Sequence, residues 1–291
     1  MSNIGPTKKN DENLSAFDYE EMQEQDSTMI RENFKNLTKL KINKIRNAET
    51  PFFLIKNMNF PKLRYLKFNN VSFGEQDYKC IIFSKCKALE KLIINGTYNF
   101  EAKMLQNFSK YLTRLILSNN NFVNSDFENI MKDYLIKSDS LRMNLELLFF
   151  SNNSLSKIDF DKLVYSPKHK FASLKELDFH KNRITKFSIS PDFFIELKCI
   201  NCCYNKFSKS EFPSDSKILV LLSGNLFLTD IDRCKSYYKV LEKQLSDYSI
   251  SLTHLAISYL PNEFCDEYLQ KIIIKDNILL NLRKLDLSYY K

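Results

Sequence analysis

Apolar residues recur along this chain with one local spacing, Leu-x-x-Leu-x-Leu-x-x, and in the middle of the chain Asn occupies the next position. The clearest copies are LTRLILSNNNF, which begins at Leu112, and LKELDFHKNRI, which begins at Leu174. Ten copies align on the first position of the motif, and they begin at Leu37, Leu63, Leu89, Leu112, Leu145, Leu174, Leu197, Lys217, Leu252 and Leu282. Self-similarity at a period of about 20 to 35 residues predicts a repeat architecture in which each copy packs on its neighbours.

Positions 3 to 7 of each copy are predicted to form a short strand, because successive side chains of a strand alternate between two faces. Positions 4 and 6, such as Leu115 and Leu117, then lie inward, and positions 3, 5 and 7 lie outward. Asn at position 9 is expected to turn the chain and to bond buried backbone groups. It occupies that position in five consecutive copies, as Asn120, Asn153, Asn182, Asn205 and Asn225.

The segments that connect the motifs differ in length, and several have helical periodicity. In residues 127–136 the apolar side chains fall on one helical face, with Ser125 or Asp126 as the expected N-cap. Similar stripes occur in residues 100–112, 234–245 and 268–273. The steps of 23 and 20 residues after Leu174 and Leu197 leave little room for a helix, so extended returns are predicted there.

From about residue 34 onward the chain resembles the leucine-rich-repeat superfamily, on the motif described above. The resemblance implies an α/β solenoid: a leucine-rich-repeat horseshoe with a parallel concave β-sheet and mixed helical and extended convex returns. It also implies a scaffold for protein binding through the concave face. We therefore expect residues 33–291 to form one leucine-rich-repeat domain of about ten irregular repeats.

Charge separates the first residues from the rest. Residues 1–32 contain eight acidic and three basic residues, a net charge of −5, whereas residues 33–291 carry +13. The first stretch is predicted to be an acidic, disordered tail. It contains no apolar signal-peptide core, and the chain has no run near the roughly 18 apolar residues of a membrane span. With seven cysteines and no paired end-cap pattern, reduced thiols and a cytoplasmic or nuclear location are expected.

The outward positions of the first copies are predominantly basic, and equivalent positions of adjacent strands lie about 4.8 Å apart. Apolar outward residues follow in the next copies. The predicted partner-binding residues are Lys39, Lys41, Tyr65, Lys67, Lys91, Ile93, Arg114, Ile116, Leu147 and Phe149. We interpret them as a docking site for an acidic segment of a protein partner, with the apolar residues as anchors. Solvated surface lysines are the alternative interpretation, and the acidic tail folding onto the same rows is a variant of the first.

Other binding functions stay open at the level of sequence. A basic stripe with an aromatic residue also fits a nucleic-acid-binding solenoid, although no RNA- or DNA-binding motif accompanies it. A substrate-recognition subunit of a ubiquitin-ligase or signalling assembly, or a bacterial or parasite effector, would be a binding module in another context. The last copy leaves Leu285 and Leu287 uncovered, which suggests a shortened product or self-association through an open C-terminal repeat.

Candidate chemistry is limited to one cluster. The motif register predicts His180 and Cys203 as neighbours, with Asp178 two residues before His180, an arrangement that resembles a thiolate nucleophile with its base. The absence of an evident oxyanion hole or enclosed pocket favours chance adjacency on an open surface. Cys199 and Cys203 lie about 13 Å apart along a strand, too far for one zinc ion. No enzymatic activity, metal or cofactor is therefore expected.

Overall fold

The computed structural model describes residues 16–20, 36–44, 60–73, 86–97, 100, 105, 109–136, 138–163, 170–189, 193–207, 219–222, 225, 254–256 and 284–286. The chain divides into two compact units, Met1–Leu115 and Ile116–Lys291. Each unit is built on parallel strands that come from successive copies of the motif, and each is described by itself below.

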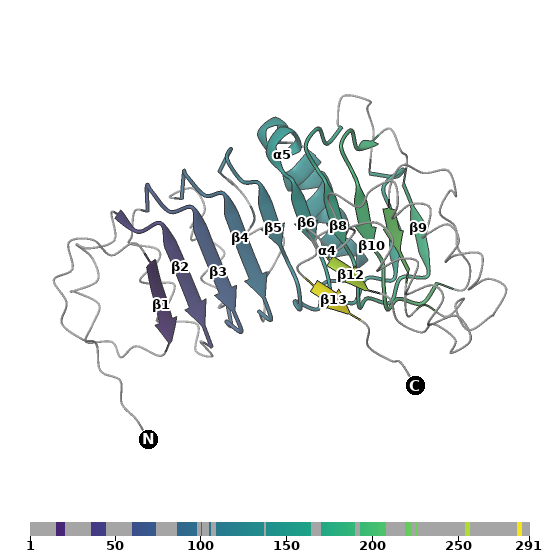
Figure 1. Cartoon of the computed structure of the whole chain (residues 1–291), viewed down its shortest axis with the longest axis horizontal. Helices are drawn as coiled ribbons and strands as arrows, with labels where there is room; N and C mark the ends of the chain where they lie inside the picture. The colour runs from purple at the N-terminus through teal and green to yellow at the C-terminus, as the bar shows by residue number, and fades with distance from the viewer. Residues whose placement is uncertain are drawn as a thin grey trace, which may run out of the picture. The chain divides into compact units, whose positions relative to one another are not determined.

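In the first unit, neighbouring strands follow the chain order (Figure 1). They are β1 (Ala16–Glu20), β2 (Lys39–Asn43), β3 (Tyr65–Asn69), β4 (Lys91–Asn95) and β5 (Arg114–Ile116), which ends at the unit boundary. The register joins equal motif positions, because Lys39 is opposite Tyr65 and Tyr65 is opposite Lys91. Identical spacing of the apolar residues in each copy thus brings all inward side chains to one face.

In the second unit, the main sheet has the strand order β6-β8-β10-β11. These strands are β6 (Leu147–Phe149), β8 (Glu176–Asp178), β10 (Cys199–Asn201) and β11 (Leu219–Leu221). Two further parallel pairs join β7 (Lys157–Asp159) with β9 (Lys186–Ser188), and β12 (His254–Ala256) with β13 (Lys284–Asp286). All ten aligned copies therefore place a strand where the motif predicts one, and β9 confirms an extended return after Leu174.

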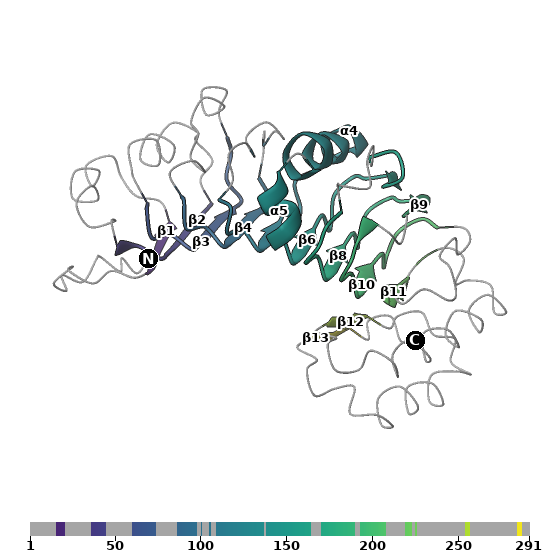
Figure 2. The same cartoon turned by 90° about the horizontal axis from the view of Figure 1, so that it is seen from above.

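The described helices of the second unit follow one another after the Asn120 copy. They are α4 (Asn124–Asn129), the π-helix η5 (Ile130–Ile136) and α5 (Asp139–Asn144), and in Figure 2 α4 lies across the core from β6 and β8. The predicted helix is confirmed, but its predicted N-cap is wrong. The N-cap is Val123, whose N–H donates to Oδ2 of Asp126 at 2.9 Å. Asp126 is thus inside the first turn and bonds back to the cap.

The other three predicted helical stripes fall mostly on residues that the structure does not describe. Leu105 and Leu112 are buried as expected, whereas most of residues 100–108 and all of 234–245 and 268–273 lie outside the described residues. Within the described part of the chain, no helix is long and apolar enough to cross a membrane.

The core of the second unit is rich in phenylalanine. The rings of Phe127, Phe150, Phe160 and Phe179 lie 5.1 to 6.3 Å apart between centroids, mostly edge to face. Such pairs add specific packing to the burial of large apolar surfaces. Helix α4 contributes Phe127, the motif strands contribute Phe150 and Phe179, and Phe160 comes from the return after β7. The returns therefore pack directly on the inward side of the sheet.

Candidate functional site

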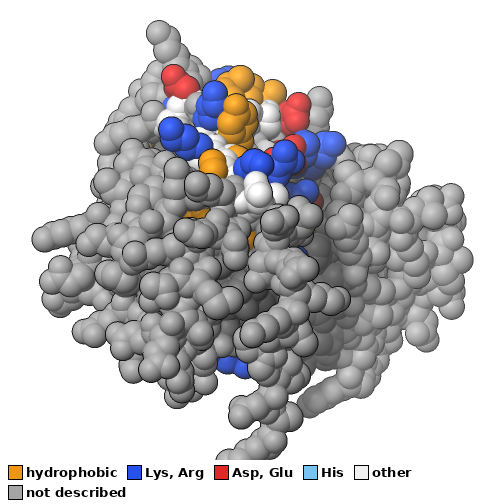
Figure 3. Space-filling view, turned by 90° about the vertical axis from the view of Figure 1, so that its left-hand side faces the viewer, with side chains coloured by type: hydrophobic (Ala, Val, Ile, Leu, Met, Phe, Trp, Pro, Cys, Tyr) orange, Lys and Arg blue, Asp and Glu red, His pale blue; other side chains and the backbone are white. Residues whose placement is uncertain are grey.

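The outward positions of the first unit form two adjacent rows of mainly basic side chains. The first row contains Lys39, Tyr65, Lys91 and Arg114, and the second contains Lys41, Lys67 and Ile93. We call these seven residues the basic rows. Lys39 and Arg114 are exposed and the other five are half-buried. Figure 3, viewed from the end of the molecule where β1 lies in Figure 1, shows Lys and Arg side chains beside apolar ones among the described residues.

Tyr65 lies between two of the lysines and contacts both. The Nζ atom of Lys39 is 5.3 Å from the centroid of the Tyr65 ring, and that of Lys91 is 5.5 Å away on the other side. Attraction to the electron-rich ring face stabilises each ammonium group at such distances. The ring therefore holds two positive charges close together in one row.

The electrostatic environment of Lys91 reflects this crowding. Partial burial, followed by repulsion from Arg114, Lys67 and Lys39, lowers the pKa of Lys91 below its ordinary value of 10.5. The outward strand positions of β2, β3 and β4 contain no carboxylate. The carboxylate of Glu90, outside the strands, lies 3.6 Å from Arg64. The basic rows are thus a surface on which positive charges repel one another.

The second unit contains the other three predicted residues, Ile116, Leu147 and Phe149, and all are half-buried at outward positions. The N–H of Leu117 donates to the carbonyl of Phe149 at 2.8 Å, so Ile116 lies next to this strand. On the opposite side, Leu147 is in register with Glu176, and Phe149 with Asp178. The apolar positions therefore border an acidic strand within this unit.

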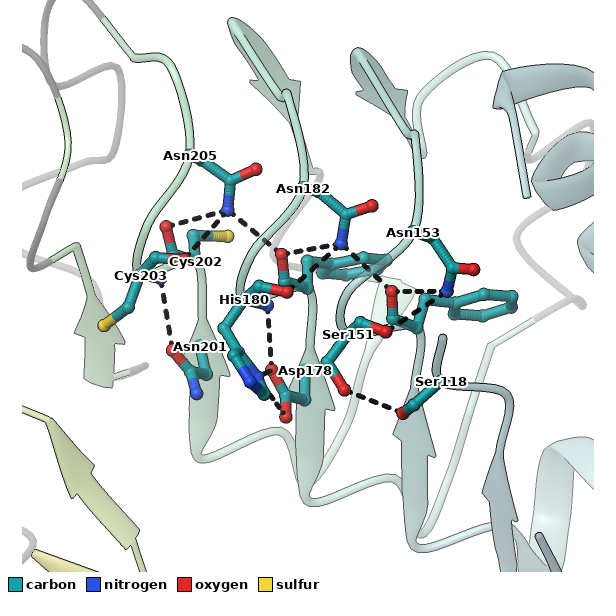
Figure 4. A network of polar contacts seen from close by, with 12 residues as sticks. Ser118, Ser151, Asn153, Asp178, His180, Asn182, Asn201, Cys202, Cys203 and Asn205 are labelled. Atoms are coloured by element: carbon teal, nitrogen blue, oxygen red, sulfur yellow. Dashed lines mark hydrogen bonds and ion pairs between the residues drawn. The ribbon is translucent and has the colours of Figure 1, made fainter. Parts of the chain in front are cut away.

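Of the three residues of the predicted Cys–His–Asp cluster, Asp178 and His180 form an ion pair (Figure 4). Nδ1 of His180 is 2.8 and 2.9 Å from the two carboxylate oxygens of Asp178. Cys203 is 1% exposed. Burial and the carboxylates of Glu176 and Asp178 raise the pKa of Cys199 well above its ordinary value, so that thiol stays protonated. Among the described residues no group of His, Cys, Asp or Glu has the geometry of a metal site.

Position 7 differs from the expected outward exposure in the central copies. Ser118, Ser151 and Cys203 are buried rather than exposed. The hydroxyl oxygens of Ser118 and Ser151 lie 2.7 Å apart and share a hydrogen bond. Small side chains at the end of the strand fit beneath the following turn, so position 7 adds little to the outward surface of these copies.

The asparagines at position 9 form a hydrogen-bonded ladder from one copy to the next (Figure 4). The side-chain amide of Asn153 donates to the carbonyls of Leu117 and Phe150, both at 2.9 Å, and its oxygen accepts from the N–H groups of Asn120 and Phe122. Asn182, Asn205 and Asn225 repeat this arrangement in the following copies. Each amide thereby satisfies backbone groups of its own copy and of the preceding one, as the motif predicts. The described repeats have the leucine-rich-repeat fold.

Comparison with known proteins gives distant structural similarity only. The chain is similar to an internalin-like protein of Listeria monocytogenes (14% identity, TM-score 0.42, covering 65% of this chain and 59% of that chain) and to a leucine-rich-repeat protein of Leptospira interrogans (18%, 0.40, 93% and 70%). The functional domain of InlJ from Listeria monocytogenes is 14% identical with a TM-score of 0.45, and the match covers 95% of this chain and 54% of that chain. This chain thus spans about three fifths or less of the two Listeria proteins. No family model and no curated protein matches the sequence.

The sheet contains one strand that the ten aligned copies of the motif do not include. Within the acidic stretch 1–32, where disorder is predicted, β1 pairs in parallel with β2 over five residues, from Ala16 opposite Lys39 to Glu20 opposite Asn43. The signal is an additional copy of the motif, with Leu14, Phe17 and Tyr19 at positions 1, 4 and 6, beginning 23 residues before Leu37. Its acidic composition and the aromatic residues in place of leucine conceal it. The rest of residues 1–32 lies outside the described part of the chain.

Proposed function

We propose that this leucine-rich-repeat protein is a non-catalytic protein-interaction module and that the basic rows bind an acidic segment of a partner. The observation that carries the proposal is the strand register, which places Lys39 and Lys91 on either side of Tyr65 and Lys41 beside Lys67. Partial burial and then repulsion from Arg114, Lys67 and Lys39 lower the pKa of Lys91 on this surface. A ligand that brings carboxylates to this surface relieves that repulsion. Complementary charge also accelerates association and excludes basic partners.

The half-buried apolar positions support the same proposal. Ile93 lies in the second row beside Lys67, with which it is in register. In the second unit, Ile116, Leu147 and Phe149 offer further apolar area at outward positions. Binding energy at protein interfaces is concentrated in a few such apolar or aromatic residues, and surrounding charges contribute mainly to orientation. We therefore propose Ile93 as the apolar anchor beside the lysines, which orient the acidic segment. Leu147 and Phe149 are proposed as apolar contact residues of the second unit taken by itself.

The test is affinity capture from lysate of the source cells in the presence of nuclease, with two variants of identical charge change. Lys67→Glu/Lys91→Glu reverses the basic rows, and Lys62→Glu/Lys87→Glu reverses two exposed lysines outside the strands. For a partner bound by the basic rows, we expect a roughly tenfold or greater loss of recovery with the first variant only. Quantitative mass spectrometry measures the recovery.

Two results would contradict the proposal. Equal recovery with wild type and Lys67→Glu/Lys91→Glu would show that the basic rows do not form the contact. Capture that disappears on nuclease treatment would favour the nucleic-acid-binding alternative, for which binding to single- or double-stranded oligonucleotides should weaken steeply with salt.

A further inference from the structure

The β1 strand combines an edge position with a charge opposite to that of its neighbours. Among the strands that the structure describes, β1 has β2 as its single neighbour, whereas β2, β3 and β4 each lie between two strands. Residues 1–32 carry −5, whereas residues 33–115 contain 16 basic and five acidic residues. An edge strand exposes backbone groups that accept another chain. In the described part of the first unit, β1 therefore occupies the edge of β2, a place at which an added strand extends the basic sheet.

The register of β1 reproduces what an acidic ligand of the basic rows would need. Asp18 is opposite Lys41, and Glu20 is opposite Asn43. By this register, Asp18 and Glu20 take the motif positions of Lys41 and Asn43, and Phe17 and Tyr19 take those of Leu40 and Ile42. Asp18 thereby continues the row of Lys41 and Lys67. The pattern is an acidic residue at every outward position after Ala16 and an aromatic residue at every inward position.

The length of chain between the two strands permits exchange at this edge. Glu20 and Lys39 are separated by 18 residues, which can extend to about 60 Å. Release of β1 therefore does not require β2 to move. The backbone bonds of a parallel edge strand are the same for any extended peptide, so selectivity comes from the alternating side chains.

We propose that residues 16–20 are an internal pseudo-ligand, which occupies the β2 edge until an acidic, strand-forming segment of the partner displaces it. The partner segment carries the same alternation of aromatic or apolar residues with Asp or Glu, and it adds to β2 in parallel. This inference rests on the proposed function, because the proposed function identifies the competing segment as an acidic segment of the partner. The pairing of residues 16–20 with β2 is independent of it.

The test uses the full-length protein and a fluorescent peptide of residues 11–26, DENLSAFDYEEMQEQD. Phe17→Pro/Tyr19→Pro in the protein removes two backbone donors from β1 and opens the β2 edge. We expect the peptide to bind this variant at least tenfold more tightly than wild type, as measured by fluorescence anisotropy. A peptide with the same two prolines should not bind, because it cannot pair with β2.

A second variant covers the possibility that the proline protein fails to fold. Asp18→Lys/Glu20→Lys keeps the apolar pattern of β1 and places a positive charge opposite Lys41, so repulsion should weaken the internal strand and raise peptide binding severalfold. Circular dichroism verifies that each variant is folded. If neither folded variant binds the peptide more tightly than wild type, β1 is a fixed first repeat and the inference is wrong.

The outcomes separate this inference from the proposed function. If partner capture depends on Lys67 and Lys91 but the β1 variants gain neither peptide nor partner, the pseudo-ligand is wrong and the proposed function stands. If the peptide binds the opened edge but no partner depends on the basic rows, the pseudo-ligand inference stands and the proposed function is wrong. If the wild-type protein is a dimer and the proline variant is a monomer, β1 is exchanged between two copies. That result would overturn the proposal that β1 binds β2 of its own chain.

Discussion

At the scale of single residues, the turn after each strand has a conformation that the motif does not reveal. Position 8 has a positive φ, between 53° and 63°, in every copy whose turn the structure describes through its backbone. The residues are Lys44, Asn70, Gly96, Asn119, Asn152, Lys181 and Tyr204. Glycine and asparagine adopt this left-handed conformation readily, but lysine and tyrosine do so at a cost of about 1 kcal/mol.

Lys181→Gly should therefore stabilise the protein. Lys181 has φ 53° and an exposed side chain, and its Nζ lies 5.8 Å from the centroid of the Tyr204 ring, a weak contact that the change removes. Relief of the left-handed strain should outweigh that loss and raise the free energy of unfolding by about 0.5 kcal/mol. Urea denaturation measures the change. The same substitution at exposed Lys186 in β9 is the control, because glycine within a strand should destabilise instead.

Position 9 of the turn can be predicted from residue type, whereas position 8 cannot. Asn153 and its equivalents are identifiable because their side chains perform a task that few other residues perform, bonding backbone groups of two copies. Position 8 needs only a backbone conformation. Several residue types tolerate it at modest cost, so no single residue type marks it.

At the scale of elements, strands were predictable and returns only partly so. Each strand depends on two inward apolar residues at a fixed spacing, such as Leu66 and Phe68 in β3. The returns have no shared pattern. The helical segment formed by α4 and η5 was predictable from the apolar stripe of residues 127–136. Strand β7 was not, because Ile158 and Phe160 are too few to distinguish a strand from a turn. The basic rows followed directly from strand alternation, whereas β1 was obscured by its charge.

The returns nonetheless contribute strongly to the core, which Phe160→Ala would show. The Phe160 ring lies within 6.3 Å of the rings of Phe127, Phe179, Phe187, Phe193 and Phe194, centroid to centroid. Removing it should lower the free energy of unfolding by about 3 to 5 kcal/mol, through lost burial and the cavity that remains. Urea denaturation followed by circular dichroism measures the loss.

The matched control is Phe149→Ala, which removes the same atoms from a half-buried outward position. It should cost less than half as much, because solvent already reaches that ring. Similar losses for the two variants would mean that the return after β7 does not pack as tightly as the ring distances indicate.

At the scale of the whole molecule, the net charge of +8 conceals a division into an acidic beginning and a strongly basic stretch, residues 33–115. Such a field attracts acidic partners before contact, and salt screens it over about 10 Å at 0.1 M. The charge distribution should therefore govern how fast a partner binds more than how long it stays.

We expect the association rate constant for fluorescent poly-L-glutamate to fall by about tenfold or more between low and high salt, while the dissociation rate changes much less. Stopped-flow fluorescence measures both. Lys67→Glu/Lys91→Glu should flatten the salt dependence and Lys62→Glu/Lys87→Glu should flatten it less. Equal slopes for the two variants would show that overall charge, rather than the basic rows, attracts the ligand.

The alternation of inward and outward residues in strands such as β3 has a consequence for how this molecule changes over evolutionary time. Leu66 and Phe68 are buried, whereas Tyr65 and Lys67 on the same strand are half-buried and face outward. Selection for folding acts mainly on the first pair, and selection for recognition can act on the second. A descendant of this gene can therefore acquire a new binding preference by substitutions at alternate codons of its strands, while it inherits the ancestral core unchanged.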